Sequence, residues 1–396
     1  MSTNQRMYYI DWLRVIAFGL LFVFHSFRLF DTYPWHLKNP ETSISINYII
    51  EFMHSWRMYI IFLVSGAGTY FAMKSKRQNF LNGRIKRLII PYIFGVLILI
   101  PPQKFIEAIQ QSGFEGNYFL FLTQLPNGLI NENFGWNLLW TGYLGYHIWY
   151  LVYLFVQTIL FLPLFKLILR YQNNVCEQSS KLFRSFYSFW LIIIPFVLLE
   201  LLLRPVFPQY LNWADFATFS LYFLFGFLLQ INQKIILFIE KNAYKFLTIA
   251  IFCWSLYLIN RSFLDNISIP EYTLNYFFTI ILKNLNSICW VFAFIGLGKK
   301  FLDFNHRYLN DLNQGILPFY ILHQTVIVIF GYFVVQWELS ILEKFLVILS
   351  TSFIVTIGLY QIIRRNNTMR FFFGMKRMGI KPGKTSVFQE TPNQNE

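Results

Sequence analysis

The chain has few charged residues and few cysteines for its length. Charged side chains make up 13% of its 396 residues, roughly half the share found in soluble domains, which excludes a soluble globular protein. The three cysteines, Cys176, Cys253 and Cys289, lie far apart, so a disulfide scaffold and a cysteine-based metal site are both excluded. Hydrophobic residues make up 56% of the chain, which excludes a disordered protein.

Long apolar stretches occupy most of the chain. A bilayer core about 30 Å thick requires roughly 20 mainly apolar residues per helix. The sequence therefore predicts an all-α integral membrane protein with about ten transmembrane helices. The ten candidate segments are 12–30, 46–72, 85–103, 148–168, 188–203, 214–231, 245–260, 277–298, 314–336 and 341–363. Residues 1–377 are expected to form one membrane domain, and residues 378–396 a polar, disordered cytoplasmic tail.

Lysine and arginine are distributed unevenly between the two sides of this predicted topology. Of the 33 basic residues, 24 fall in segments on the same side as the N-terminus and four on the other side. Cytoplasmic loops are the ones enriched in Lys and Arg, so both termini are predicted to be cytoplasmic. The net charge of +14 then reflects topology, and no nucleic-acid partner is expected.

The first predicted helix carries three ionisable residues, Asp11, Arg14 and His25. Such residues are costly inside a membrane and indicate function by default. Arg14 and His25 are eleven residues apart, which places them on one face of a helix with a rise of ~16 Å between them. Asp11 precedes Arg14 by three residues and is expected to pair with it. The alternative is that this polar face has no function and that neighbouring helices satisfy its hydrogen bonds.

The second predicted helix repeats this pattern with Glu51, His54 and Arg57, each three residues after the last. Because this helix runs in the opposite direction, His54 is expected at about the depth of His25. Two histidines at matched depth are typical of a proton-handling site. The alternative is that His54 and Glu51 serve only to orient other groups.

Three further basic residues, Arg84, Lys86 and Arg87, lie at the inner end of the third helix. Two guanidinium groups on one side of a helix favour phosphate binding. For these residues taken alone, ordinary positive-inside anchoring is the commoner explanation. His147 opens the fourth helix and is typical of an interfacial residue, whereas His323 lies near the middle of the ninth, which favours a function.

These motifs together resemble the membrane acyltransferase-3 family. The resemblance rests on Arg14 with His25 in the first helix, on Arg84-Ile-Lys-Arg87, and on four longer stretches in the family's order. These stretches are FMHSWRMYIIFLVSG (52–66), IPYIFGVLILIPPQKF (90–105), HIWYLVYL (147–154) and FYILHQ (319–324). Within the family, they look most similar to the branch that succinylates periplasmic glucans.

The resemblance implies an acyltransferase of the bacterial inner membrane that moves an acetyl or succinyl group from cytoplasmic acyl-CoA to a hydroxyl of a cell-envelope glycan. It implies no permanently bound cofactor and no metal, and its partners are membrane lipids, the acyl-CoA donor and the extracytoplasmic glycan. The resemblance implies His25 and Arg14 for catalysis and Arg84 and Arg87 for donor binding. The positions of the other polar residues add His54 to the catalytic group, Lys86 to the donor group, and Asp11, Glu51, Arg57, His147 and His323 as supporting residues. General-base catalysis by His25 and a covalent acyl-histidine both remain open.

A different class of protein could also account for the polar residues within the membrane. A polytopic secondary transporter or flippase for an envelope precursor also suits a polar stripe across a bundle, but paired Gly- or Pro-broken helices in two matched halves are lacking. The aromatic residues Trp136, Trp140, Tyr143 and Trp149 are suited to stacking on sugar rings. An interfacial aromatic belt explains them equally well.

Overall fold

The computed structural model describes residues 7–75, 79–130, 135–183, 185–264 and 272–378. These residues form helices and no strand, which confirms the predicted all-α membrane fold. Except for Met378, the predicted tail 378–396 lies outside the described residues. The elements are α1 Tyr8–Phe27, α2 Ile44–His54, α3 Arg57–Lys74, α4 Phe80–Arg84, η1 Ile85–Ile89, α5 Ile90–Phe94, η2 Gly95–Leu99, α6 Ile100–Ser112, α7 Tyr118–Ile130, α8 Trp140–Gly145, η3 Tyr146–Ile148, α9 Trp149–Arg170, α10 Gln172–Leu182, η4 Phe186–Ser188, α11 Phe189–Leu203, α12 Trp213–Leu229, α13 Gln233–Lys241, α14 Ala243–Leu264, α15 Leu274–Phe301, α16 Leu309–Val334, α17 Ile341–Ile363 and α18 Asn367–Phe372.

Eight helices in the described part of the chain are long and apolar enough to cross a membrane, or nine if the bent pair α12 and α13 forms one span. Each of the ten predicted segments lies largely in helix. The span count of ten, and the cytoplasmic side of both termini, stay predictions.

The second predicted segment, 46–72, is not one continuous helix, so the prediction is wrong at this point. A turn at Ser55 and Trp56 separates α2 from α3, and the backbone leaves helical geometry at Trp56, where φ is −140° and ψ is −24°. The break makes His54 the last residue of α2 and Arg57 the first residue of α3. The even spacing of Glu51, His54 and Arg57 therefore does not place them along a single helix face.

The third predicted segment is continuous but contains two π-helical turns, η1 and η2. The N–H of Ile90 donates to the carbonyl oxygen of Ile85, and the N–H of Ile100 to that of Gly95, five residues back. One residue separates each turn from a proline, Pro91 or Pro101, which has no N–H and whose ring crowds the preceding helical turn. A wider turn accommodates this crowding without ending the helix.

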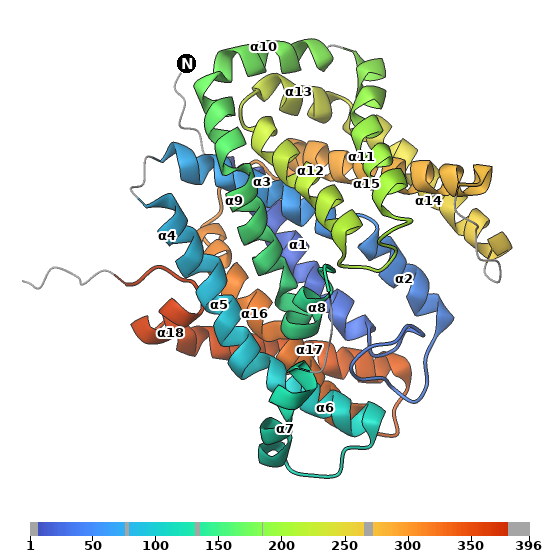
Figure 1. Cartoon of the computed structure of the whole chain (residues 1–396), viewed down its shortest axis with the longest axis vertical. Helices are drawn as coiled ribbons and strands as arrows, with labels where there is room; N and C mark the ends of the chain where they lie inside the picture. Colours follow the sequence, from blue (N-terminus) through green and yellow to red (C-terminus); the bar gives the residue numbers. More distant parts are fainter. Residues whose placement is uncertain (1–6, 76–78, 131–134, 184, 265–271, 379–396) are drawn as a thin grey trace, which may run out of the picture.

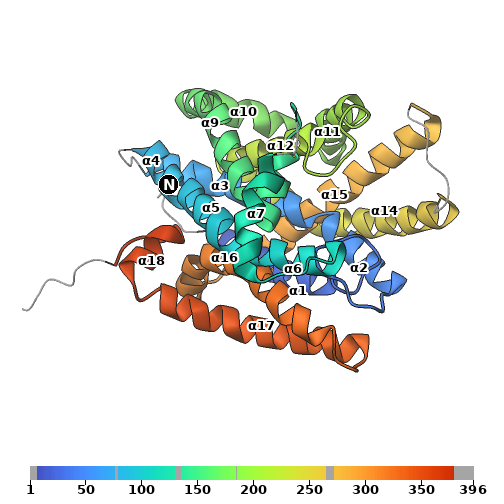
Figure 2. The same ribbon diagram turned by 60° about the horizontal axis from the view of Figure 1, so that its bottom comes forward.

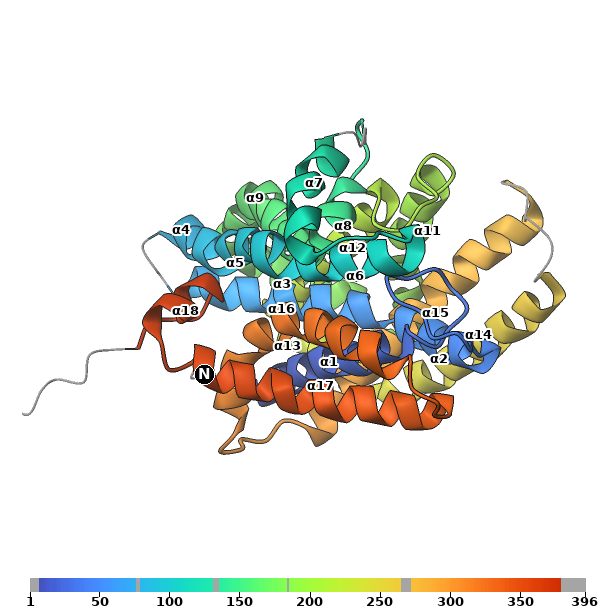
Figure 3. The same ribbon diagram turned by 90° about the horizontal axis from the view of Figure 1, so that it is seen from below.

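The bundle is organised around α1 and α3. α1 packs against α3, α15, α16 and α17, and α3 packs along α12. Figure 1 shows α10 beside α13 at one end of the molecule, with α6 and α7 at the other. Figure 2 shows α17 along one face, and Figure 3 shows α14 and α15 projecting together as an antiparallel pair.

The contact between α3 and α12 depends on two glycines. A Cβ atom on Gly66 would lie 1.9 Å from the carbonyl oxygen of Phe223, and one on Gly226 would lie 1.8 Å from that of Leu63. These neighbours are backbone atoms, so they cannot rotate away. Small residues at such crossings are the usual means by which membrane helices approach each other closely.

We expect Gly66→Ala to destabilise the bundle, because the new methyl group forces α3 and α12 apart. Overpacking of this kind costs about 1–3 kcal/mol. The measurement is the melting temperature in detergent, with Gly358→Ala in α17 as the control, because a Cβ atom there meets nothing within 4 Å. The control should melt at or above the wild-type temperature. Equal melting temperatures for the two variants would contradict this packing.

A buried ion cluster joins α11, α12 and α15. Glu200, which is fully buried, accepts hydrogen bonds from Arg204 at 2.8 and 2.9 Å. Arg204 also donates to Asp215 at 2.7 Å, and Lys283 donates to Glu200 at 3.2 Å. Breaking a buried pair leaves an uncompensated charge, so the cluster fixes the relative register of these three helices.

Candidate active site

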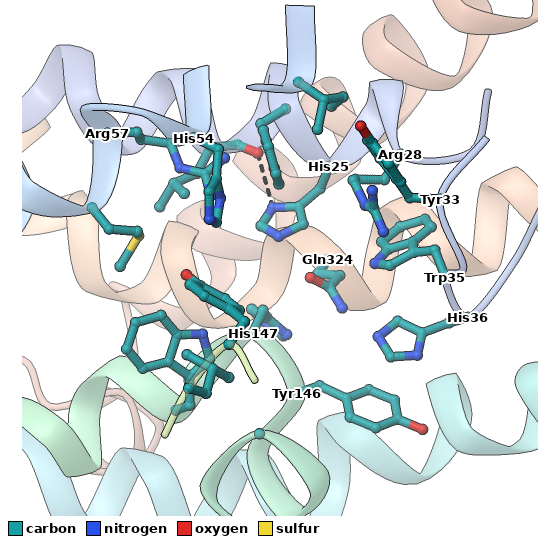
Figure 4. A pocket seen from close by; sticks show the side chains of 18 of the residues that line it. His25, Arg28, Tyr33, Trp35, His36, His54, Arg57, Tyr146, His147 and Gln324 are labelled. Carbon is teal, nitrogen blue, oxygen red and sulfur yellow. Dashed lines mark hydrogen bonds between the residues drawn. The ribbon is translucent and has the colours of Figure 1, made fainter. Parts of the chain in front are cut away.

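A cavity of about 740 Å³, which we call the histidine cavity, opens between α1, α2, α3, η3 and the loops near residues 35 and 210. Figure 4 shows His25, His54, His147 and Gln324 reaching it from different sides. Its walls also carry Arg28, Tyr33, Trp35, His36, Glu51, Arg57, Glu107, Tyr143, Tyr146, Trp149 and Tyr210. A large, partly apolar cavity with convergent polar groups is the expected form of a ligand site.

His25 is held by two hydrogen bonds to the same ring nitrogen. Its Nδ1 lies 2.9 Å from the carbonyl oxygen of Leu21, the dashed contact in Figure 4, and 3.0 Å from Nε2 of His323. Nδ1 of His323 in turn lies 2.5 Å from the carbonyl oxygen of Tyr320. A carbonyl oxygen only accepts, so we assign the protons to both Nδ1 atoms. Nε2 of His25 is then the nitrogen with an available lone pair.

His147 packs next to this pair. Its ring centroid lies 5.0 Å from that of His323 and 6.3 Å from that of His25. Its Nε2 lies 3.1 Å from the carbonyl oxygen of Ile321, so this nitrogen donates and Nδ1 is left as an acceptor. Nδ1 is buried and has no hydrogen-bond partner among the described residues. Tyr320 fixes the backbone here, because its hydroxyl donates to the carbonyl oxygen of His147.

A second layer of amides supports α16 beneath the histidines. Nε2 of Gln324 donates to Oε1 of Gln103 at 3.0 Å, and Nε2 of Gln103 donates to Oγ1 of Thr325 at 2.8 Å. Both glutamines are buried. Satisfied networks of this kind hold a site rigid, so α6 and α16 carry His323 as one unit.

The break between α2 and α3 supplies His54 and Arg57 to the opposite wall of the cavity. His54 is exposed to the cavity, and its ring lies 4.8 Å from the ring of Tyr210. Arg57 is only 4% exposed and lies over the ring of Phe24, with Cζ 3.4 Å from the ring centroid. The structure thus brings His54 and His25 to one cavity, as their matched depth predicts.

The loop near residue 36, α6 and η3 together form a polar rim around this cavity. Nδ1 of His36 lies 3.3 Å from Oε1 of Glu107, whose other oxygen accepts a hydrogen bond from Tyr146. The ring of His36 stacks on that of Tyr146 at 4.0 Å. Lys38 donates to Asp31 at 2.8 Å; burial lowers the pKa of Lys38, and the Asp31 carboxylate partly opposes that shift.

A second cavity of about 500 Å³, which we call the arginine cavity, lies between α1, α3, η1, α9 and α16. Four basic residues line it, and none of its described lining residues is acidic; the four are Arg14, Arg84, Lys86 and Arg87. Arg84 donates from Nη2 to Oγ1 of Thr69 at 2.6 Å, while its buried Nε has no partner among the described residues. Arg14 pairs with Asp11 at 3.7 Å, as their spacing predicts.

An aromatic partition of Phe18, Tyr150 and Tyr320 separates the two cavities. Ring centroids lie 6.0 Å apart for Phe18 and Tyr150, 5.3 Å for Phe18 and Tyr320, and 5.8 Å for Tyr150 and Tyr320. All three rings are buried. Ser65 fixes the edge of the partition, because its hydroxyl lies 2.5 Å from that of Tyr150. Arg14 and His25 therefore lie on the same side of α1 but in different cavities.

Several residues of the site were not predicted from the sequence. His36 and Glu107 contribute to the rim from segments far apart in the chain. The dense aromatic content of residues 33–36 is the sequence feature that points to this loop. Of the aromatic residues considered for sugar stacking, Tyr143 and Trp149 line the cavity, whereas Trp136 is 92% exposed. No group of three or more His, Cys, Asp or Glu in the described ranges is arranged to hold a metal ion.

The amino-acid sequence was compared with those of known proteins and protein families. The model of the acyltransferase-3 family, described as an acyltransferase domain, matches residues 7–364. Glucans biosynthesis protein C of Escherichia coli strain SMS-3-5 is 25% identical over 386 residues, which cover 94% of this chain and 95% of that protein. The protein of the same name from strain K12 is 24% identical over the same shares. No solved structure matches the chain. Because the family match extends over nearly the whole chain, the protein belongs to the acyltransferase-3 family and is a multi-pass membrane acyltransferase.

Proposed function

We propose that the protein is an O-acyltransferase of the bacterial inner membrane that moves an acetyl or succinyl group from cytoplasmic acyl-CoA to a hydroxyl of an extracytoplasmic glycan. The observation that carries the proposal is the pair of cavities along α1, one basic and one containing a histidine base. The name of the relatives, glucans biosynthesis protein C, supports a glycan as the acceptor.

The arginine cavity is suited to the nucleotide end of the donor. The 3′-phosphate and pyrophosphate of acyl-CoA are anions that cannot enter lipid. Arg84 and Arg87 offer two planar donor forks for phosphate oxygens, and Lys86 adds a third positive charge. The nucleotide is proposed to stay in this cavity while the thin, largely uncharged pantetheine arm extends along α1 and carries the thioester past the aromatic partition.

The histidine cavity is suited to the acceptor hydroxyl. Nε2 of His25 takes the hydroxyl proton as the sugar oxygen attacks the thioester carbonyl carbon. The carbon–sulfur bond then breaks, and the CoA thiolate takes the proton back from His25, so that an ester and free CoA thiol are the products. His323 stabilises the required tautomer of His25 through its 3.0 Å contact with Nδ1. If the acyl group passes first to His25, Nε2 is the nucleophile instead.

Purified protein mixed with labelled acyl-CoA and a glycan acceptor tests this function directly. We expect release of free CoA thiol and appearance of label on the glycan, in a form that mild alkali removes. Label that remains on the protein when the acceptor is omitted identifies the acyl-histidine route. Movement of intact donor or glycan across a reconstituted membrane without thiol release would contradict the proposal and favour a transporter or flippase.

A further inference from the structure

Arg57 is a buried cation that has no acidic partner in the part of the chain that the structure describes. It is 4% exposed, and its Nε and Nη1 atoms form no hydrogen bond with any described residue. Among the described residues no Asp or Glu forms an ion pair with it, although the ring of Phe24 stacks on the guanidinium. Desolvating a charge without hydrogen bonds is costly, and a cation–π contact returns only part of that cost. A group of this kind is typical of a site that a ligand completes.

Other charged groups in the histidine cavity already have partners in the structure. Arg28 donates to Asp31 at 2.6 Å, Glu107 contacts His36 and Tyr146, and Glu51 accepts a hydrogen bond from Tyr33. The positive charge of Arg57 is therefore the one that this cavity leaves uncompensated within the described chain.

The position of Arg57 in the fold adds to the positive electrostatic potential around its side chain. Arg57 is the first residue of α3, and Arg57 and Met58 both line the cavity. The first N–H groups of a helix have no intrahelical acceptor and carry a partial positive charge. The guanidinium and the helix terminus therefore act in the same direction, on the wall that also carries His54.

We propose that Arg57 binds an anionic oxygen group, a carboxylate or a phosphate, carried by a substrate whose reacting atoms lie at His25. Two sources supply this chemistry: the free carboxylate at the far end of a dicarboxylic acyl group, or an anionic substituent on the acceptor. The inference rests on the proposed function and extends it, because Arg57 then selects charged over neutral substrates.

Stability and binding measurements test Arg57 without requiring catalysis. Arg57→Met removes an uncompensated buried charge and keeps an unbranched apolar stem, so we expect the unliganded variant to melt a few degrees above wild type. Methyl succinate, which carries one carboxylate, should raise the melting temperature of wild type but not of the variant. Dimethyl succinate, which is neutral, should affect neither, and Arg365→Met, an exposed arginine outside both cavities, should respond as wild type does. A lower melting temperature for Arg57→Met in the absence of ligand would identify a structural role and overturn the proposal.

Kinetic measurements identify the source of the anion. If the acyl group carries it, Arg57→Met should lower the preference for succinyl-CoA over acetyl-CoA by about ten- to hundred-fold, the effect of losing one charge-assisted hydrogen bond. If the acceptor carries it, the preference for a phosphorylated over a neutral glycan should fall by that factor with either donor. Arg57→Lys should restore part of the preference, because it keeps the charge and loses the fork.

Two kinetic outcomes would also overturn the inference, and a third outcome concerns the proposed function alone. An equal loss of rate with every donor and acceptor would assign Arg57 to the transition state, and unchanged preferences would remove it from substrate selection. If wild type transfers no acyl group from any donor, the proposed function fails. The methyl succinate measurement then decides the anion site independently.

Discussion

Replacing His25 by alanine is expected to lower kcat for acyl transfer by about 10²–10⁴-fold, the usual contribution of a general base. The variant loses the only nitrogen, Nε2, that the hydrogen bonds to Leu21 and His323 leave with an available lone pair in this pair of histidines. Donor affinity should be retained, because the basic residues proposed to bind the nucleotide lie in the other cavity. The measurements are thiol release under saturating donor and donor binding by calorimetry in detergent.

His306→Ala is the matched control for this experiment. His306 lies in the loop before α16, contacts Trp12 and Tyr308, and lines neither cavity. It should transfer acyl groups at the wild-type rate. Near-normal glycan acylation by His25→Ala, with insertion into the membrane confirmed, would exclude His25 as the base or the nucleophile.

Removing both Arg84 and Arg87 is expected to raise the donor KM and to leave kcat much less affected. Each charge-assisted hydrogen bond to a phosphate is worth ~1.5–3 kcal/mol, so the double alanine variant should bind donor at least a hundred-fold more weakly. An interaction that is equally strong in the ground state and in the transition state changes KM alone. The double lysine variant should recover part of the loss, since an ammonium keeps the charge without the planar fork.

The matched control for this pair is Arg364 with Arg365, two arginines at the end of α17 that line neither cavity. Their double alanine variant should keep the wild-type KM. Unchanged donor affinity in the Arg84 and Arg87 variant would reduce those residues to topology anchors and would place the donor elsewhere.

Polar residues within apolar segments were predictable because the membrane makes them costly. Arg14 and His25 stand out against a helix of apolar residues, and helical periodicity alone places them on one side of α1. The same reasoning indicates His54, and the structure brings it to the histidine cavity. His36 and Glu107 could not be identified in this way. A polar residue in a loop or near a helix end is ordinary, and only the tertiary fold brings these two together.

The helix irregularities also include some that the sequence marks and one that it does not. The π-helical turns precede Pro91 and Pro101, so the sequence marks their positions even though periodicity predicts an ordinary helix. The break at Ser55 and Trp56 has no such marker, because neither residue interrupts a helix by its own geometry. α2 packs mainly against α1, whereas α3 packs mainly along α12, and the break between them positions Arg57 at the start of α3.

The aromatic partition has a consequence for the energy supply of the cell. Moving one elementary charge through a membrane potential of 100 mV releases about 2.3 kcal/mol, so a continuous wet passage between the two cavities would discharge the membrane. The buried rings of Phe18, Tyr150 and Tyr320 act as electrical insulation between the cavities. If the donor arm passes here as proposed, it is narrow enough to replace these contacts and to keep the barrier closed during turnover. The bilayer can then hold many copies of the protein without losing its proton gradient.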